Sequence, residues 1–167
     1  MGGQRRTIER LKQKQMRGRG KKLIVEVCKE VGKEIRRAAR KEFPNEYLGF
    51  LIGHDLGEKV AIVDVWHSDY INSPEMIEEG AYYAAMADAR EHARTVGGDV
   101  VGDVHSHAYK YDEACPVAMD CAPSEGDMKL GSDGLMAICM VRQEKNGRLT
   151  TKLNFYPPIA AVSEVYV

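Results

Sequence analysis

The sequence lacks several features that would assign the protein to a well-known class. No apolar run approaches the ~18 residues of a membrane-spanning helix, and no apolar segment follows the basic N-terminal residues as in a secretory signal. There is no glycine-rich phosphate loop and no dinucleotide-binding fingerprint. The four cysteines, Cys28, Cys115, Cys121 and Cys139, show no disulfide framework. We therefore expect a cytoplasmic protein in a reducing compartment, without membrane contact.

What the sequence contains fits one globular domain with a charged extension. Its 167 residues are 44% hydrophobic and 29% charged, which suits a single core. Residues 1–22 hold nine Lys or Arg against one Glu, whereas the remaining residues hold 15 basic and 24 acidic side chains. We expect residues 1–22 to form a disordered basic arm and residues 23–167 to form the folded domain. A second interpretation makes the arm a contact for nucleic acid or an acidic partner, although it lacks aromatic residues for stacking on bases.

Hydrophobic spacing predicts helices and strands in the order α-β-β-α-β-α-β-β. Helical patterns cover residues 23–43, residues 73–96 and a short segment from Ser124 to about residue 131. Strand patterns cover residues 46–53, 60–66, 100–107, 135–142 and 149–155. The run 46–53 is almost continuously apolar, as in a strand buried on both faces, and Asn146-Gly147 predicts a hairpin turn. The order indicates an α/β fold, with a mixed β-sheet and helices packed on its faces.

His105 and His107 lie two residues apart in the predicted strand 100–107. Alternate residues of a strand project from the same face, about 6.5–7 Å apart along the chain. Two imidazoles that lean together from such positions can both reach one zinc ion at about 2.0–2.1 Å. Taken alone, the pair also fits two half-buried histidines with ordinary hydrogen bonds.

Ser124, Asp127 and Glu46 provide further groups that metal chemistry uses. The segment "SEGD" (124–127) fits a capping box, in which a serine and an acidic residue three positions later complete the start of a helix. The same helix start would hold Asp127 at the mouth of a site. Glu46 opens the apolar run 46–53 and is either a solvent-facing residue or a general base for a metal-activated water.

Together these residues resemble a known family. The pattern Glu-x-x-Gly-x-Leu-x-Gly from Glu46, the strand "VVGDVHSHA" and the Ser-x-x-Asp motif are similar to those of the JAMM (MPN-plus) zinc metalloproteases. These are isopeptidases, and they include ubiquitin-removing enzymes of the proteasome lid and prokaryotic relatives. The resemblance covers Leu23 to about Phe155 and leaves out the basic arm. It implies a single MPN-type domain with a cytidine-deaminase-like fold.

The resemblance also implies a role for each candidate residue. His105, His107 and Asp127 would bind one catalytic Zn²⁺, with a water in the fourth position. Glu46 would take the proton of that water and pass it to the leaving amine, and Ser124 would donate a hydrogen bond to the tetrahedral oxyanion.

The sequence departs from the family pattern at two residues and in the length of one loop. Ala108 follows the second histidine where the family usually has proline, and the gap to the Ser-x-x-Asp motif is longer than usual, at sixteen residues (108–123). Asp103 replaces a hydrophobic or aromatic residue. It shares the strand parity of the two histidines, so it is a candidate acceptor for an imidazole N–H, although an unrelated hydrogen bond fits as well.

The long gap leaves the third ligand open. Thiolate is a good zinc ligand, so Cys115 or Cys121 could take the place of the water or of Asp127, which would give a closed and inert site. Asp120 is another candidate for the third ligand. The interpretation that we favour makes residues 108–123 a lid or substrate-binding loop over the zinc, because long loops are often functional.

These observations predict a zinc-dependent metallopeptidase of the JAMM type. By resemblance, its substrate would be a ubiquitin-like or sulfur-carrier protein, cleaved after a C-terminal Gly-Gly at an amide or isopeptide bond. Two alternatives stay open: an inert MPN-type scaffold that binds a partner, and a zinc hydrolase of a small molecule. The sequence does not predict an oligomeric state.

Overall fold

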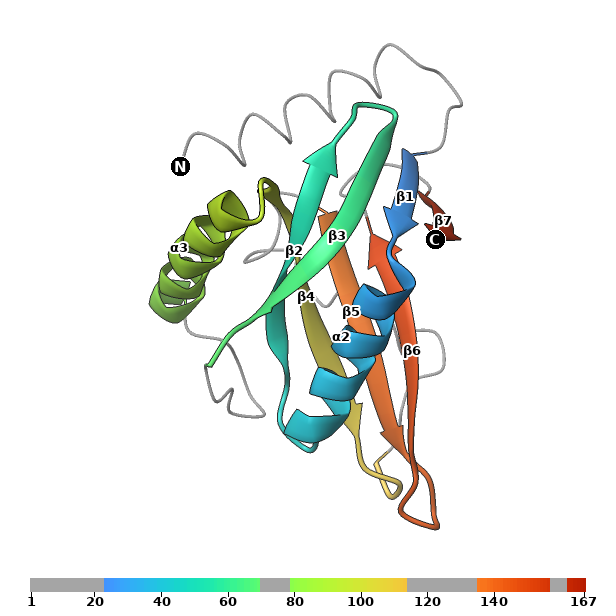
Figure 1. Cartoon of the computed structure of the whole chain (residues 1–167). Helices are drawn as coiled ribbons and strands as arrows, with labels where there is room; N and C mark the ends of the chain where they lie inside the picture. The colour runs from blue at the N-terminus through green and yellow to red at the C-terminus, as the bar shows by residue number, and fades with distance from the viewer. Residues whose placement is uncertain (1–22, 70–78, 114–134, 157–161) are drawn as a thin grey trace.

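The computed structural model describes residues 23–69, 79–113, 135–156 and 162–167. Within these ranges the chain forms seven strands and two helices, which Figure 1 labels. They are β1 (Leu23–Val27), α2 (Lys29–Glu42), β2 (Leu48–Asp55), β3 (Lys59–His67), α3 (Glu79–Thr95), β4 (Asp99–Tyr109), β5 (Leu135–Gln143), β6 (Leu149–Tyr156) and β7 (Val162–Tyr166).

The strands form one mixed sheet, as the sequence predicts. Their order is β6-β5-β4-β2-β3-β1-β7. The pairs β1/β3, β1/β7 and β4/β5 are parallel, and the pairs β2/β3, β2/β4 and β5/β6 are antiparallel. Helix α2 packs against β3, β5 and β6, although β4 and β2 separate β5 from β3 in the sheet. The sheet therefore curls around α2, with α3 on its other side (Figure 1).

The two helices cover opposite faces of β2. Helix α2 buries Val31, Ile35 and Ala39, one helical turn apart, in the larger core cluster, which also contains Leu51 of β2. Helix α3 packs on the other face of the strand. Its buried residues there are Tyr82, Ala85, Met86, Ala89 and Ala93, and they meet Leu48, Phe50 and Ile52. The prediction of a strand buried on both faces is confirmed, because Leu48 to Gly53 are all buried.

Two parts of the predicted element order are wrong. Leu23–Val27 is a strand that pairs with β3 and β7, and α2 begins only at Lys29. The segment "LIVEV" alternates buried and more exposed residues, which is the period of a strand, although its apolar residues also continue the spacing of the following helix. Strand β7 was not predicted at all.

Other predictions are confirmed or lie outside the described residues. The β5–β6 hairpin turns through Asn146-Gly147, where Gly147 has a φ of 84°. Helix α3 lies within the predicted range 73–96, but its predicted start at Ser73 is outside the described residues. So are the basic arm (1–22) and the short helix from Ser124. Neither α2 nor α3 is long and apolar enough to cross a membrane.

Candidate metal centre

His105 and His107 project together from the second half of β4. His105 is buried, with 6% of its surface exposed, and His107 is half-buried. Their Nε2 atoms lie 3.2 Å apart, and the ring centroids are 5.1 Å apart. Two nitrogens that bind one tetrahedral zinc at about 2.0–2.1 Å lie roughly 3.3 Å from each other. The separation fits a hydrogen bond between the two rings, and it also fits two donors to one shared ion.

The pair lies on the face of the sheet that also carries α3. His105 is opposite Leu48 of β2 and beside Ile138 of β5, and Leu48 belongs to the core cluster under α3. Asp103, two residues before His105, is buried on the same face. Its Oδ2 accepts a hydrogen bond of 2.5 Å from the hydroxyl of Tyr82 in α3. A role of Asp103 toward an imidazole stays a prediction.

Glu46 lies two residues before β2, the strand next to β4. Tyr47 and Ser106 exchange two hydrogen bonds, because Ser106 N donates to Tyr47 O at 2.9 Å and Tyr47 N donates to Ser106 Oγ at 2.7 Å. The two bonds hold Tyr47, the residue before β2, against Ser106, so the backbone of Glu46 lies close to the part of β4 that carries the histidines. Glu46 is half-buried, and the role of its side chain beside the histidine pair stays a prediction.

The remaining predicted site residues lie outside the described residues. These are Cys115, Asp120, Cys121, Ser124 and Asp127. Among the residues that the structure describes, no three His, Cys, Asp or Glu side chains form a group that could hold a metal. The described part therefore contains two of the three predicted ligands, and the identity of the third stays a prediction.

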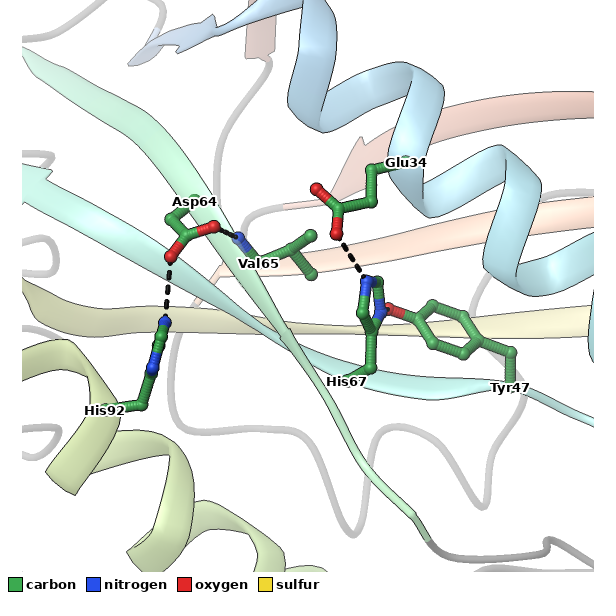
Figure 2. A network of polar contacts seen from close by, with 6 residues as sticks. All are labelled: Glu34, Tyr47, Asp64, Val65, His67 and His92. Atoms are coloured by element: carbon green, nitrogen blue, oxygen red, sulfur yellow. Dashed lines mark hydrogen bonds and ion pairs between the residues drawn. The ribbon is translucent and has the colours of Figure 1, made fainter. Parts of the chain in front are cut away.

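A chain of polar contacts beside the site was missed by the sequence analysis. The hydroxyl of Tyr47 lies 2.6 Å from Nδ1 of His67, and Nε2 of His67 lies 2.9 Å from Oε1 of Glu34. Figure 2 shows the three side chains. Burial of Tyr47, together with the Glu34 carboxylate and nearby Cys139, raises the pKa of its phenol well above the ordinary value. The phenol therefore stays protonated. His67 has no metal-binding spacing, and nothing in the sequence indicates its pairing with residues 20 and 33 positions away.

A second histidine–carboxylate pair ties the other helix to β3. Nε2 of His92 in α3 lies 2.9 Å from Oδ2 of Asp64, whose Oδ1 accepts the N–H of Val65 (Figure 2). His92 has no neighbouring histidine or cysteine at metal-binding spacing in the sequence. Its contact fits a histidine that fastens α3 to the sheet.

We expect Ser106→Ala to destabilise the fold measurably. The change removes the hydroxyl that accepts the N–H of Tyr47 in a buried position. Leaving a buried donor without a partner costs about 1–3 kcal/mol. Urea denaturation followed by circular dichroism would measure the loss. Thr95→Ala is the control, because Thr95 is exposed and its removal should change the free energy of unfolding by less than about 0.5 kcal/mol. Equal stability of the two variants would contradict the assigned contact.

The architecture defines a class of protein. A curled mixed sheet around one helix, with a second helix on its other face and His-x-His on a central strand, is the architecture of an MPN-type α/β domain. The chain belongs to the prokaryotic homologs of the JAB domain, whose family pattern it matches over residues 29–150. The match spans most of the described elements and contains Glu46, both histidines and the Ser-x-x-Asp motif.

Solved structures show the same fold. A protein from Desulfitobacterium hafniense superposes with a TM-score of 0.57 at 19% identity, covering 86% of this chain and 94% of that one. A JAB1/MPN domain protein from Archaeoglobus fulgidus gives a TM-score of 0.50 at 20% identity, with coverage of 85% and 98%. A protein from Salinibacter ruber gives 0.50 at 19% identity, with coverage of 83% and 91%. No curated protein matches the sequence significantly. At these identities the likeness concerns the fold.

Proposed function

We propose that this chain is a zinc-dependent hydrolase of amide or isopeptide bonds. The observation that carries the proposal is the separation of 3.2 Å between Nε2 of His105 and Nε2 of His107 on β4, whose neighbour β2 begins two residues after Glu46. Membership of the JAB family supports the proposal. The sequence also has a Ser-x-x-Asp motif similar to that of the JAMM metalloproteases.

The donors present fit zinc. Two imidazole nitrogens and one carboxylate are a common protein ligand set for a catalytic zinc, and Asp127 would supply the carboxylate. Bound there, zinc would supply Lewis acidity and would make a water molecule more acidic. The buried position of His105 fixes its ring, and the partly exposed His107 marks the side from which a substrate could approach.

Glu46 is the proton carrier in this proposal. It accepts a proton from the attacking water and delivers it to the amine that leaves, since an amine departs readily only after protonation. It can do both from a strand end beside the ligands, without being a ligand. Ser124 donates a hydrogen bond to the developing oxyanion, and removing such a donor typically lowers turnover about 10²–10³-fold.

The substrate that we propose ends in Gly-Gly, as in ubiquitin-like and sulfur-carrier proteins. An extended tail without side chains can pass close to a metal and can pair with the backbone of a strand. Selectivity for Gly-Gly would then be steric, because a larger side chain would not fit over the site.

Two measurements on the purified full chain test the proposed function. We expect bound zinc near one ion per chain. We also expect cleavage of a fusion in which a ubiquitin-like protein is joined through its Gly-Gly to a reporter. The same fusion with Ala-Ala at the junction is the control and should be cleaved much more slowly. Bound zinc without cleavage of any Gly-Gly fusion would favour a small-molecule hydrolase. A chain with neither zinc nor cleavage would favour the scaffold.

We predict that a Cys115→Ser, Cys121→Ser double variant keeps its zinc and its turnover. A thiolate on the zinc would occupy the open position that catalysis needs. Zinc content and initial rates beside the wild type would measure the effect. Loss of zinc from the double variant would show a closed, cysteine-bound site and would overturn the interpretation of 108–123 as a lid.

A further inference from the structure

Tyr47 lies directly after the proposed proton carrier, and its side chain belongs to the core cluster under α2. The histidine pair and the neighbouring Leu48 are on the other face, which carries α3. Tyr47 is 2% exposed. Its backbone N–H and C=O are both bonded to Ser106, the residue between the two histidines. These two bonds tie the backbone next to Glu46 to the strand that carries both histidines.

The side chain of Tyr47 is held at its polar end through two more residues (Figure 2). A carboxylate only accepts hydrogen bonds, so Nε2 of His67 carries the proton that faces Glu34 at 2.9 Å. In the neutral ring Nδ1 is then an acceptor, and it receives the Tyr47 hydroxyl at 2.6 Å. Glu34 belongs to α2 and His67 to the end of β3. The Tyr47–His67–Glu34 contacts thus join the start of β2 to α2 and to β3.

Gly49 leaves room for this arrangement. A methyl group at Gly49 would overlap the Tyr47 hydroxyl and would lie 3.1 Å from the carbonyl oxygen of Trp66. The hydroxyl occupies the space that a side chain at position 49 would fill. The glycine three residues after Glu46 is therefore explained by the position of the Tyr47 hydroxyl.

We propose that the Tyr47–His67–Glu34 chain is a positioning device for the catalytic pair of strands. It fixes the backbone of Glu46 against His105-Ser106-His107 from the face opposite the site. None of its three side chains touches the substrate or the metal, so all three are positioning residues. The inference rests on the proposed function for its catalytic consequence, whereas its structural part concerns the described residues alone.

Tyr47→Phe is the sharpest test, because it removes one oxygen and keeps the packing of the ring. We expect zinc content to stay at the wild-type level, KM to change little and kcat to fall about 10–100-fold, as expected when a catalytic group is displaced slightly. We also expect hydrogen exchange of the Tyr47 and Ser106 amides, followed by NMR, to become about 10-fold faster through local opening. The Ala137 and Val141 amides of β5 report global stability and should change much less.

Two further variants distinguish an effect of the Tyr47–His67–Glu34 contacts from a general loss of stability. Gly49→Ala should push the Tyr47 hydroxyl from His67 and reproduce the effects of Tyr47→Phe, although it alters no polar group. Tyr83→Phe is the matched control, because Tyr83 is 49% exposed on α3. It should change neither kcat nor the exchange rates of the Tyr47 and Ser106 amides.

The NMR spectrum of His67 tests the contacts of Tyr47 without any measurement of catalysis. Long-range ¹H–¹⁵N spectra of the full chain should show His67 with its proton on Nε2, with or without added zinc, and Tyr47→Phe should shift its Nδ1 resonance. If the wild type proves inactive, the proposed function fails, but the exchange rates and the His67 spectrum still decide the structural part. Unchanged exchange of the Tyr47 and Ser106 amides in Tyr47→Phe would overturn the positioning chain. An unchanged kcat in an active enzyme would overturn its role in catalysis.

Discussion

A Glu46→Gln variant is expected to keep its zinc and to lose hydrolysis by about 10²–10⁴-fold, the contribution of a positioned general acid–base. Glutamine has nearly the same shape but neither accepts nor delivers the proton. Both the attack of water and the departure of the amine become slower, because the water is not deprotonated and the leaving amine is not protonated. The backbone contacts of Tyr47 with Ser106 do not involve the Glu46 side chain, so the fold should be unaffected.

The matched control for this variant is Glu91→Gln. Glu91 is exposed on α3, so the substitution makes the same chemical change on the surface. Its turnover and its zinc content should equal those of the wild type. Zinc analysis and initial rates with the Gly-Gly fusion give the comparison. If Glu46→Gln loses its metal together with its activity, Glu46 is a ligand and its assignment as a proton carrier is wrong.

A His107→Ala variant is expected to lose both zinc and activity. The paired Nε2 atoms, 3.2 Å apart, can no longer chelate one ion when one ring is absent. Loss of a group that merely supports a ligand lowers metal affinity about 10–100-fold, and loss of the ligand itself should cost at least as much. Dialysis against a mild chelator followed by metal analysis would show the difference. Asp127→Ala should behave in the same way if Asp127 is the third ligand.

His54→Ala is the control for the histidine variants. His54 is exposed near the other end of β2, where it pairs with Ala61 of β3. Zinc content and turnover of His54→Ala should match the wild type, since its imidazole is far along the strand from Leu48 and His105. Full zinc retention in both His107→Ala and Asp127→Ala would contradict the ligand set that we propose.

Much of the fold could be predicted because the sequence pattern and the burial agree. Strands β2 to β6 were predicted to within two residues at each end, since apolar runs, turn residues and Asn146-Gly147 separate them clearly. The sequence pattern does not separate Leu23–Val27 from the helix that follows, because its apolar residues continue into the helical pattern of α2 without a turn residue between them. The pairing of β1 with β7 joins segments at the two ends of the described chain, and local periodicity does not report such pairings.

The sequence likewise indicated only part of the candidate site. The spacing of His105 and His107 placed both on one strand face, and the structure confirms that their rings meet. The family pattern identified Glu46, which lies two residues before β2 and whose catalytic role stays a prediction. By contrast, the contacts of Tyr47 with His67 and of His67 with Glu34 depend on how α2, β2 and β3 pack together. No local signal in the sequence marks such long-range polar pairs.

The measurement that tests the central claim most directly is an anomalous X-ray difference map of the full chain at the zinc absorption edge. It shows the metal and its ligands together. The account predicts one strong peak bound by Nε2 of His105, Nε2 of His107 and a carboxylate oxygen of Asp127, each at about 2.0–2.2 Å. Glu46 should lie beside the peak without binding it. A map without a peak between the two imidazoles, or with a peak bound by Cys115 or Cys121, would contradict the account.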